Sequence, residues 1–319
     1  MLTLLGGEPT LPVMELTRHR PQDSWPSSGA VIALLKPITW FPPMWAYACG
    51  AISTGAGFGD RWFFVLCGVL LAGPLLCGTS QAVNDWFDRH VDAINEPDRV
   101  IPSGRMPGQW GLYVALIMSA LSMIVAAMLG SLIFAAALIG LCFAWGYSAP
   151  PLRFKQNGWI GNGVVGFSYE TLPWLTAATV MTGVAPNGPV WIVALLYGIG
   201  AHGILTLNDF KAITGDREMG INTLPVLHGA RPAAAIACIV MAAAQAGVCA
   251  LLLFVGLPLF AIAIGILLAL QLGCMVRFVR DPVRFAVWYS AIGVGLFVTG
   301  MVISAFGLRS LSQPALSMM

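Results

Sequence analysis

Charged residues are scarce in this sequence of 319 residues. Lys, Arg, Asp and Glu together make up 9% of it, hydrophobic residues make up 58%, and the mean hydropathy is +0.81. Because soluble domains carry about 25% charged residues, this composition excludes an ordinary soluble domain and predicts an integral membrane protein. The sequence also lacks a run of basic residues that would indicate nucleic-acid binding.

Paired cysteine motifs are absent as well. None of the seven cysteines forms a C-x-x-C pair, and all lie in apolar segments. This pattern excludes a disulfide framework and a zinc site, and it predicts small buried hydrophobic residues. The N-terminus lacks a basic region before its short apolar stretch, so a cleaved signal peptide is not expected. Residues 1–27 are polar and predict a poorly ordered leader, and residues 309–319 form a short tail.

Long apolar runs are what the sequence has in abundance. Runs of spanning length predict an all-α bundle of nine transmembrane helices within residues 28–308. The predicted spans are 30–50, 62–83, 109–129, 131–148, 159–183, 188–208, 232–254, 257–277 and 284–306. Lys36-Pro37 and Pro42-Pro43 interrupt the first of these runs, so a late start or a kink is expected there.

The positive charges predict the orientation of the bundle. With a cytoplasmic N-terminus, 14 of the 16 Lys and Arg residues fall in cytoplasmic segments, and only Arg61 and Arg309 lie on the other side. Because cytoplasmic loops retain positive charge, this arrangement is strongly favoured over its reverse. All the loops that carry chemically useful residues then share the cytoplasmic side.

The second predicted span ends in a concentration of acidic residues. Of the 14 acidic residues, five lie between Asp85 and Asp98. On a helix, Asp85, Asp88 and Asp92 share one face. Such carboxylates repel one another unless a cation lies between them, and hard oxygen ligands suit Mg²⁺ completed by substrate phosphates. The pattern predicts a magnesium and diphosphate site at the membrane edge, with a solvated acidic loop as the alternative.

A second acidic motif follows the sixth predicted span. Asn208-Asp209 echoes Asn84-Asp85, and Asp216 would share a helical face with Asp209 if that helix continued. The echo predicts a pseudo-repeat of residues 30–158 and 159–283, which would place the two motifs opposite each other across a central cavity.

Cationic residues follow the fourth predicted span. Pro150-Pro151 predicts a stiff, non-helical exit, after which Arg153 and Lys155 could hold phosphate oxygens or simply anchor the chain at the membrane surface. Arg99 and Arg105 carry the same two interpretations.

Two ionisable residues lie inside apolar spans. Glu170 and His202 are costly there and could contact a substrate or pair with polar groups in the bundle. Aromatic residues of the fourth and fifth spans, including Tyr147, could line a cavity and stabilise a cationic intermediate. Many of the tryptophans lie near span ends, where an interfacial belt is the alternative.

Together these motifs resemble the UbiA-type intramembrane prenyltransferases. The resemblance rests on Asn84-Asp85-x-x-Asp88-x-x-x-Asp92, on Tyr147-Ser148-x-Pro150-Pro151-x-x-x-Lys155 and on the second acidic motif. The amino-acid sequences of both acidic motifs are similar to those of the chlorophyll and bacteriochlorophyll synthase branch. One departure is Ala212, which stands where many members carry the first Asp of a D-x-x-x-D motif ending at Asp216; Asp209 would supply the missing ligand.

The resemblance implies a reaction and a set of functional residues. The propionate of chlorophyllide or bacteriochlorophyllide would be esterified with a geranylgeranyl or phytyl group, releasing diphosphate. Mg²⁺ would be the cofactor, held by Asp85, Asp88, Asp92, Asp209 and Asp216. The catalytic residues would be Asp88, Asp92, Asp216 and Lys155. The substrate-binding residues would be Asn84, Arg99, Arg105, Tyr147, Arg153, Asn208, Lys211, Glu170 and His202.

The resemblance also implies a location and partners. The enzyme would lie in the cytoplasmic or intracytoplasmic photosynthetic membrane with its active site facing the cytoplasm, and association with other pigment-biosynthesis proteins stays open. Two alternatives remain: prenyl transfer to another acceptor, such as an aromatic acid, a naphthoate or a haem, and a secondary transporter. The acidic residues cluster at one face and the outer loops are bare, which disfavours a transporter.

Overall fold

The computed structural model describes residues 25–312 of the chain, and the rest of the predicted leader and tail lies outside this range. The regular secondary structure of the described part is helical, apart from an isolated bridge between Asn157 and Asn222. The α-helices are α1 Ser28–Leu35, α2 Phe41–Ser53, α3 Trp62–Leu70, α4 Gly78–Asn95, α5 Trp110–Leu129, α6 Ser131–Ser148, α7 Gly158–Gly166, α8 Leu172–Thr182, α9 Gly188–Asp209, α10 Ile213–Glu218, α11 Leu224–His228, α12 Ala230–Phe254, α13 Pro258–Arg280 and α14 Pro282–Ser312.

The prediction of an all-helical membrane protein is confirmed. Within residues 25–312, seven helices are long and apolar enough to cross a membrane: Gly59–Asn95, α5, α6, α9, α12, α13 and α14. Large hydrophobic side chains are exposed along these helices, as lipid-facing surfaces require.

Two of the nine predicted spans are not among these seven. Residues 30–50 are divided into α1, a short 3₁₀ turn at Pro37–Trp40, and α2. The break occurs because Lys36 adopts a left-handed backbone conformation (φ 46°) and Pro37 has no N–H to continue the helix. Residues 158–182 are continuously helical, but polar residues such as Asn162 and Glu170 dilute their hydropathy.

The helix of the second predicted span continues past residue 83. It runs through the acidic motif to Asn95, as the helical spacing of that motif predicts. The polar residues of α4 extend an apolar helix beyond the hydrophobic layer, because a helix end is set by its hydrogen bonds and not by its hydropathy.

Wide helical turns occur at two proline sites. Leu71–Cys77 is a π-helical segment that contains Pro74, and Phe167–Thr171 is another that directly precedes Pro173 in α8. Proline removes a backbone donor and its ring displaces the preceding turn, which a wide turn accommodates. Such segments are frequent at functional sites.

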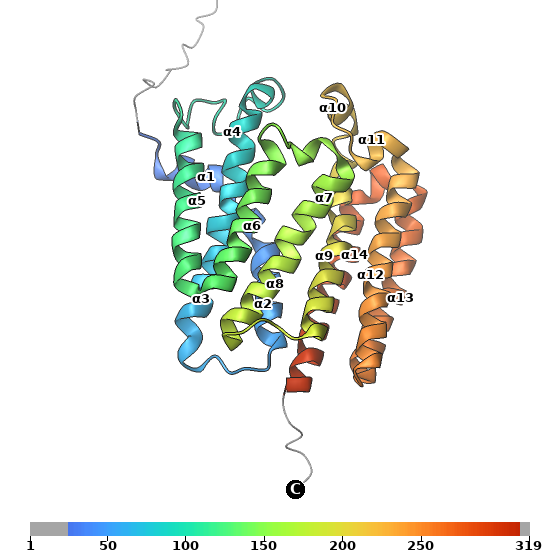
Figure 1. Ribbon diagram of the computed structural model, residues 1–319. Coiled ribbons are helices and arrows are strands. Elements are labelled where there is room, and N and C mark those ends of the chain that lie inside the picture. Colours follow the sequence, from blue (N-terminus) through green and yellow to red (C-terminus); the bar gives the residue numbers. More distant parts are fainter. Residues whose placement is uncertain (1–24, 313–319) are drawn as a thin grey trace, which may run out of the picture.

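The helices place most of the charged loops at one end of the bundle. Figure 1 shows the end of α4, the α6–α7 connection, α10 and α11 together at the upper end, while the α2–α3 and α8–α9 connections lie at the lower end. The hairpins predicted around residues 129–131, 183–188 and 254–257 are short, as expected.

Candidate functional site

The first acidic motif lies on the last turns of α4. As predicted, Asp85, Asp88 and Asp92 are on one helix, and Asp85 and Asp92 are 2% and 7% exposed. Two cations bind these buried carboxylates. Arg99 donates to Asp92 Oδ2 at 2.9 Å and to Asp85 Oδ1 at 3.5 Å, and Lys36 donates to Asp85 Oδ1 at 2.6 Å.

Arg99 reaches this position because the chain turns back directly after α4. Its guanidinium also donates to both carboxylate oxygens of Glu96, at 2.6 and 2.9 Å. These hydrogen bonds lower the pKa of Glu96. The bidentate contact fixes the guanidinium plane, so Arg99 is held in place over the two buried carboxylates.

Asp88 has one partner on the α6–α7 connection and one on its own helix. Lys155 donates to Asp88 Oδ1, and Asn84 donates to Asp88 Oδ2 at 2.9 Å and to Ser148 Oγ at 3.1 Å. The helix ends at Ser148, as the following prolines predict, and Arg153 adopts a left-handed conformation (φ 40°). The resulting turn carries Lys155 back toward α4.

The second acidic motif is built from two helices. The condition under which Asp209 and Asp216 would share a helical face is not met, because α9 ends at Asp209 and α10 starts at Ile213. Asp209 Oδ2 accepts a hydrogen bond from Asn162 at 3.3 Å. Asp216 Oδ2 accepts one from Thr223 at 3.2 Å. Burial raises the pKa of Asp216, and the hydrogen bond from Thr223 acts in the opposite direction.

The α6–α7 connection links the two motifs. Lys155 binds Asp88, and the carbonyl oxygen of Gln156 accepts a hydrogen bond from the backbone N–H of Asn222 at 3.0 Å, next to Thr223, which binds Asp216. The loops beyond the motifs meet as well, since Asn95 contacts Met219 Sδ at 3.5 Å. Lys211 is exposed in the turn between α9 and α10. These contacts bring residues far apart in the sequence together at the charged end of the bundle, and the region between the two acidic motifs is called the hollow below.

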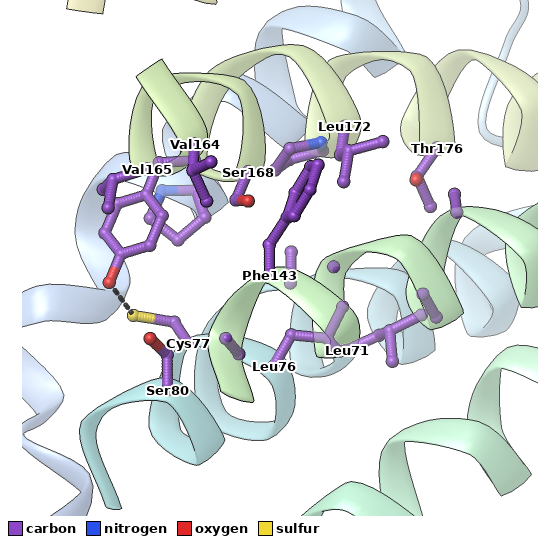
Figure 2. Close-up of a pocket in the computed structure, with 18 of the residues that line it drawn as sticks. Leu71, Leu76, Cys77, Ser80, Phe143, Val164, Val165, Ser168, Leu172 and Thr176 are labelled. Carbon is purple, nitrogen blue, oxygen red and sulfur yellow. Dashed lines mark hydrogen bonds between the residues drawn. The ribbon is translucent and has the colours of Figure 1, made fainter. Parts of the chain in front are cut away.

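An apolar cavity extends from Tyr147 into the bundle. It lies between the wide turn before α4, helix α6, and the α7–α8 rod, and it holds about 670 Å³ of unfilled space, part of it open to the surroundings. Figure 2 shows Phe143 reaching across it toward Ser168 and Leu172. Polar groups are few: Cys77 donates to Tyr169 Oη at 3.2 Å, which the dashed line marks.

Several predicted site residues lie elsewhere. Arg105 is exposed and donates to Ser103 Oγ and the Asp98 carbonyl oxygen in its own loop. Asn208 is exposed at the end of α9. Glu170 is buried near Cys49 of α2, and it does not line the cavity.

His202 and Arg153 lie near different parts of the α7 region. His202 stacks against Trp159, with ring centroids 5.2 Å apart, in a groove between α7 and α9. Arg153 lies on the α6–α7 connection, and its Nε is buried without a hydrogen-bond acceptor among residues 25–312.

Four residues of the hollow were missed by the sequence analysis. Lys36, Ser148, Asn162 and Thr223 each bind a residue of an acidic motif. Lys36 and Asn162 are polar residues in otherwise apolar runs, a signal that could have identified them. Ser148 and Thr223 lie in polar segments and give no such signal.

The donor chemistry of the hollow fits a hard cation. Asp85, Asp88, Asp92, Asp209 and Asp216 offer carboxylate oxygens, the ligands that Mg²⁺ prefers. Within residues 25–312, no three His, Cys, Asp or Glu side chains are arranged to hold a metal ion. Lys36, Arg99 and Lys155 form ion pairs with the carboxylates of α4 instead. These pairings neutralise the acidic residues and use the same oxygens that a metal ion would take.

Comparison with known proteins agrees with this architecture. The chain is 53% identical to the bacteriochlorophyll synthase 33 kDa chain of Cereibacter sphaeroides, over 90% of this chain and 95% of the relative. It is 36% identical to the chloroplastic chlorophyll synthase of Arabidopsis thaliana, over 86% of this chain and 73% of the relative.

Solved structures share the fold. A UbiA homologue from Archaeoglobus fulgidus, determined bound to GPP and Mg²⁺, superposes with a TM-score of 0.66 at 18% identity, covering 88% of this chain and 99% of that one. The family model described as the UbiA prenyltransferase family matches residues 39–298. This range includes both acidic motifs, Lys155 and the apolar cavity, and the chain therefore belongs to the UbiA prenyltransferase family.

Proposed function

We propose that the protein esterifies the propionate of bacteriochlorophyllide with an isoprenoid group, geranylgeranyl or phytyl, taken from its diphosphate. The observation that carries this proposal is that the acidic motif and the apolar cavity adjoin at the end of α6: Tyr147 lines the cavity, and the next residue, Ser148, accepts a hydrogen bond from Asn84 of the first acidic motif at 3.1 Å. A ligand with a diphosphate head and a hydrocarbon tail matches such a site. Its head would meet the charged residues at the rim, and its tail would lie in the apolar space below. The similarity to bacteriochlorophyll synthases supports the choice of acceptor.

The diphosphate would bind at the rim of the hollow. We infer that Lys36, Arg99 and Lys155 move from the carboxylates to the phosphate oxygens, since each is a charge-assisted donor. Asp85, Asp88, Asp92, Asp209 and Asp216 would then hold Mg²⁺, which when bound neutralises the leaving diphosphate. Asn84 keeps Asp88 in position through its hydrogen bond, and Thr223 does the same for Asp216.

The isoprenoid chain would occupy the apolar cavity. Side chains from three parts of the bundle line it, among them Leu76, Phe143 and Leu172. These walls keep water away from the allylic carbon. Water would otherwise attack this carbon and hydrolyse the isoprenoid diphosphate. The aromatic face of Phe143 and the ring of Tyr147 could stabilise positive charge that develops there.

The chemistry at the acceptor needs placement and no strong base. A propionate is ionised at neutral pH, so one of its oxygens attacks the allylic carbon directly. The bond between this carbon and the diphosphate oxygen breaks, and the diphosphate leaves with the electron pair. The new bond is the ester C–O bond. Rate acceleration therefore comes from orientation and from stabilisation of the leaving group.

We propose nine membrane crossings with a cytoplasmic N-terminus. The two additional crossings would be the α1–α2 region and the continuous helical rod of residues 158–182. The hollow then faces the cytoplasm, where a soluble diphosphate and Mg²⁺ are supplied. The membrane would be the photosynthetic membrane. The tetrapyrrole and the isoprenoid could enter the site from its lipid. The same membrane would hold any further pigment-biosynthesis partners.

The test is diphosphate release by the purified full-length protein in vesicles. Geranylgeranyl diphosphate and bacteriochlorophyllide should together give diphosphate and the ester when Mg²⁺ is present. EDTA should abolish both products, and Mg²⁺ should restore them. Release with an aromatic acid, a naphthoate or a haem but not with bacteriochlorophyllide would make the acceptor assignment wrong, and solute uptake without any diphosphate release would favour a transporter.

A further inference from the structure

A second apolar groove lies on the outside of the bundle between α12 and α13. It is separate from the hollow and from the cavity of Figure 2. Its walls include Ile239, Leu272 and Val276, which are 65%, 46% and 56% exposed. The groove holds about 1240 Å³ of unfilled space, much of it open to the surroundings. An opening of this size on an apolar helix surface faces the hydrocarbon layer of the membrane.

Two arginines close the charged end of this groove. Arg231 lies in the first turn of α12 and Arg280 is the last residue of α13, so both lie at the end that carries the charged loops. Among residues 25–312, neither guanidinium has a carboxylate within salt-bridge distance or donates a hydrogen bond to a protein acceptor. The nearby Asp281 directly precedes α14 and accepts a hydrogen bond from the backbone N–H of Arg284 at 3.3 Å.

Neighbouring arginines are engaged differently. Arg277 stacks over the rings of Phe285 and Trp288, each 4.6 Å from the guanidinium carbon, and Arg284 lies over Phe285 at 5.3 Å. These cations pack on aromatic faces as interfacial anchors do. In the described part of the chain, no aromatic ring lies under the guanidinium of Arg231 or Arg280, and both side chains lie at the rim of one groove.

We propose that this groove binds an anionic phospholipid, whose phosphate is held between Arg231 and Arg280 and whose acyl chains lie along α12 and α13. The match is one of charge and shape: two cations at the headgroup level and a continuous apolar channel below. Basic pockets between membrane helices on the cytoplasmic side recognise anionic headgroups in this way. Among the described residues that line the groove, none is acidic, so they offer no carboxylate ligand for the Mg²⁺ that would accompany a diphosphate substrate.

Native mass spectrometry of the full-length protein in detergent tests the proposal. The protein is titrated with phosphatidylglycerol and, separately, with phosphatidylcholine of the same chain length. Wild-type protein should bind one phosphatidylglycerol selectively. R231Q/R280Q should weaken that binding about 30-fold, which at 1.4 kcal/mol per tenfold corresponds to about 2 kcal/mol, or about 1 kcal/mol for each arginine.

The matched control removes the same charge from the same region. R277Q/R284Q should keep the selective binding, because those side chains face aromatic rings. A second variant, V276W, fills the groove while leaving both arginines, and it should also lose the lipid. Equal binding of both lipids by the wild type, which indicates annular lipid only, would overturn the proposal. Retained binding in R231Q/R280Q and V276W, or selection of an isoprenoid diphosphate over phosphatidylglycerol, would also overturn it.

Discussion

At the scale of single residues, the site is a set of carboxylates that each have an assigned partner. Arg99 bridges Asp85 and Asp92, Lys155 binds Asp88, and Lys36 also binds Asp85. Carboxylates one turn apart on α4 would otherwise repel one another. The pairing lets α4 carry three acidic residues at its end before any substrate binds.

The first prediction concerns the two acidic motifs. Asp88→Ala or Asp216→Ala should lower Mg²⁺-dependent turnover at least about 100-fold, because each removes a carboxylate from the shared hollow while the protein still inserts. The measurement is diphosphate release in vesicles. Asp60→Ala is the control, since Asp60 is exposed on the α2–α3 connection at the opposite end of the bundle. Wild-type turnover in either motif variant would remove these residues from the mechanism.

The second prediction concerns Lys36, which only the structure brings to the site. Lys36→Gln should lower kcat/KM for the isoprenoid diphosphate about 10- to 100-fold, the value of a charge-assisted hydrogen bond. Lys36→Arg should retain most of the activity, because it keeps the charge. The KM for the acceptor should not change. Equal losses in the Gln and Arg variants would indicate a purely structural role.

At the scale of elements, close helix contacts hold the cavity walls. The small residue Gly50 lets α2 approach α8, and a Cβ there would lie 2.8 Å from Trp174 Cα. Trp174 is fully buried and stacks on Tyr197 of α9 at 5.8 Å. Small residues commonly allow such approaches in membrane bundles. The contact fixes α8, whose preceding wide turn lines the cavity.

The third prediction follows from that contact. Gly50→Ala should destabilise the protein by about 1–3 kcal/mol through overpacking, seen as a lower midpoint of thermal unfolding in detergent. The matched control is Gly273→Ala in α13, where nothing lies within 4 Å of an added Cβ; its midpoint should be unchanged or higher. A wild-type midpoint for Gly50→Ala would mean that the α2–α8 contact is loose.

At the scale of the whole molecule, the bundle is polarised. The loops with the acidic motifs, Lys155, Arg231 and Arg280 all lie at one end, and the other end has few charges (Figure 1). Cytoplasmic loops retain positive charge, so this end should face the cytoplasm.

The fourth prediction tests this orientation. A membrane-impermeant thiol reagent should label Ser103→Cys in inside-out vesicles and Ala56→Cys in right-side-out vesicles, because both residues are exposed on opposite ends. The parent chain, with its own cysteines, measures background labelling. Labelling of Ser103→Cys from the outer side would reverse the orientation and place the hollow away from its soluble substrates.

The sequence by itself determined the fold class, the family and the first acidic motif. Apolar runs and charge placement are local in the chain, and the spacing of Asp85, Asp88 and Asp92 follows from helical geometry alone. The family prediction is confirmed by the match over residues 39–298. The count of nine crossings and the individual roles of the site residues remain predictions.

Only the tertiary structure decided which distant residues meet. Lys36 and Asp85 are 49 positions apart, and Asn162 and Asp209 are 47 apart; packing of helices, and not periodicity, sets such pairs. The same packing placed Glu170 and His202 away from the hollow. It also separated α9, which ends at Asp209, from α10, which carries Asp216. Periodicity indicates which face of a helix is polar, but the neighbour on that face depends on how the whole bundle assembles.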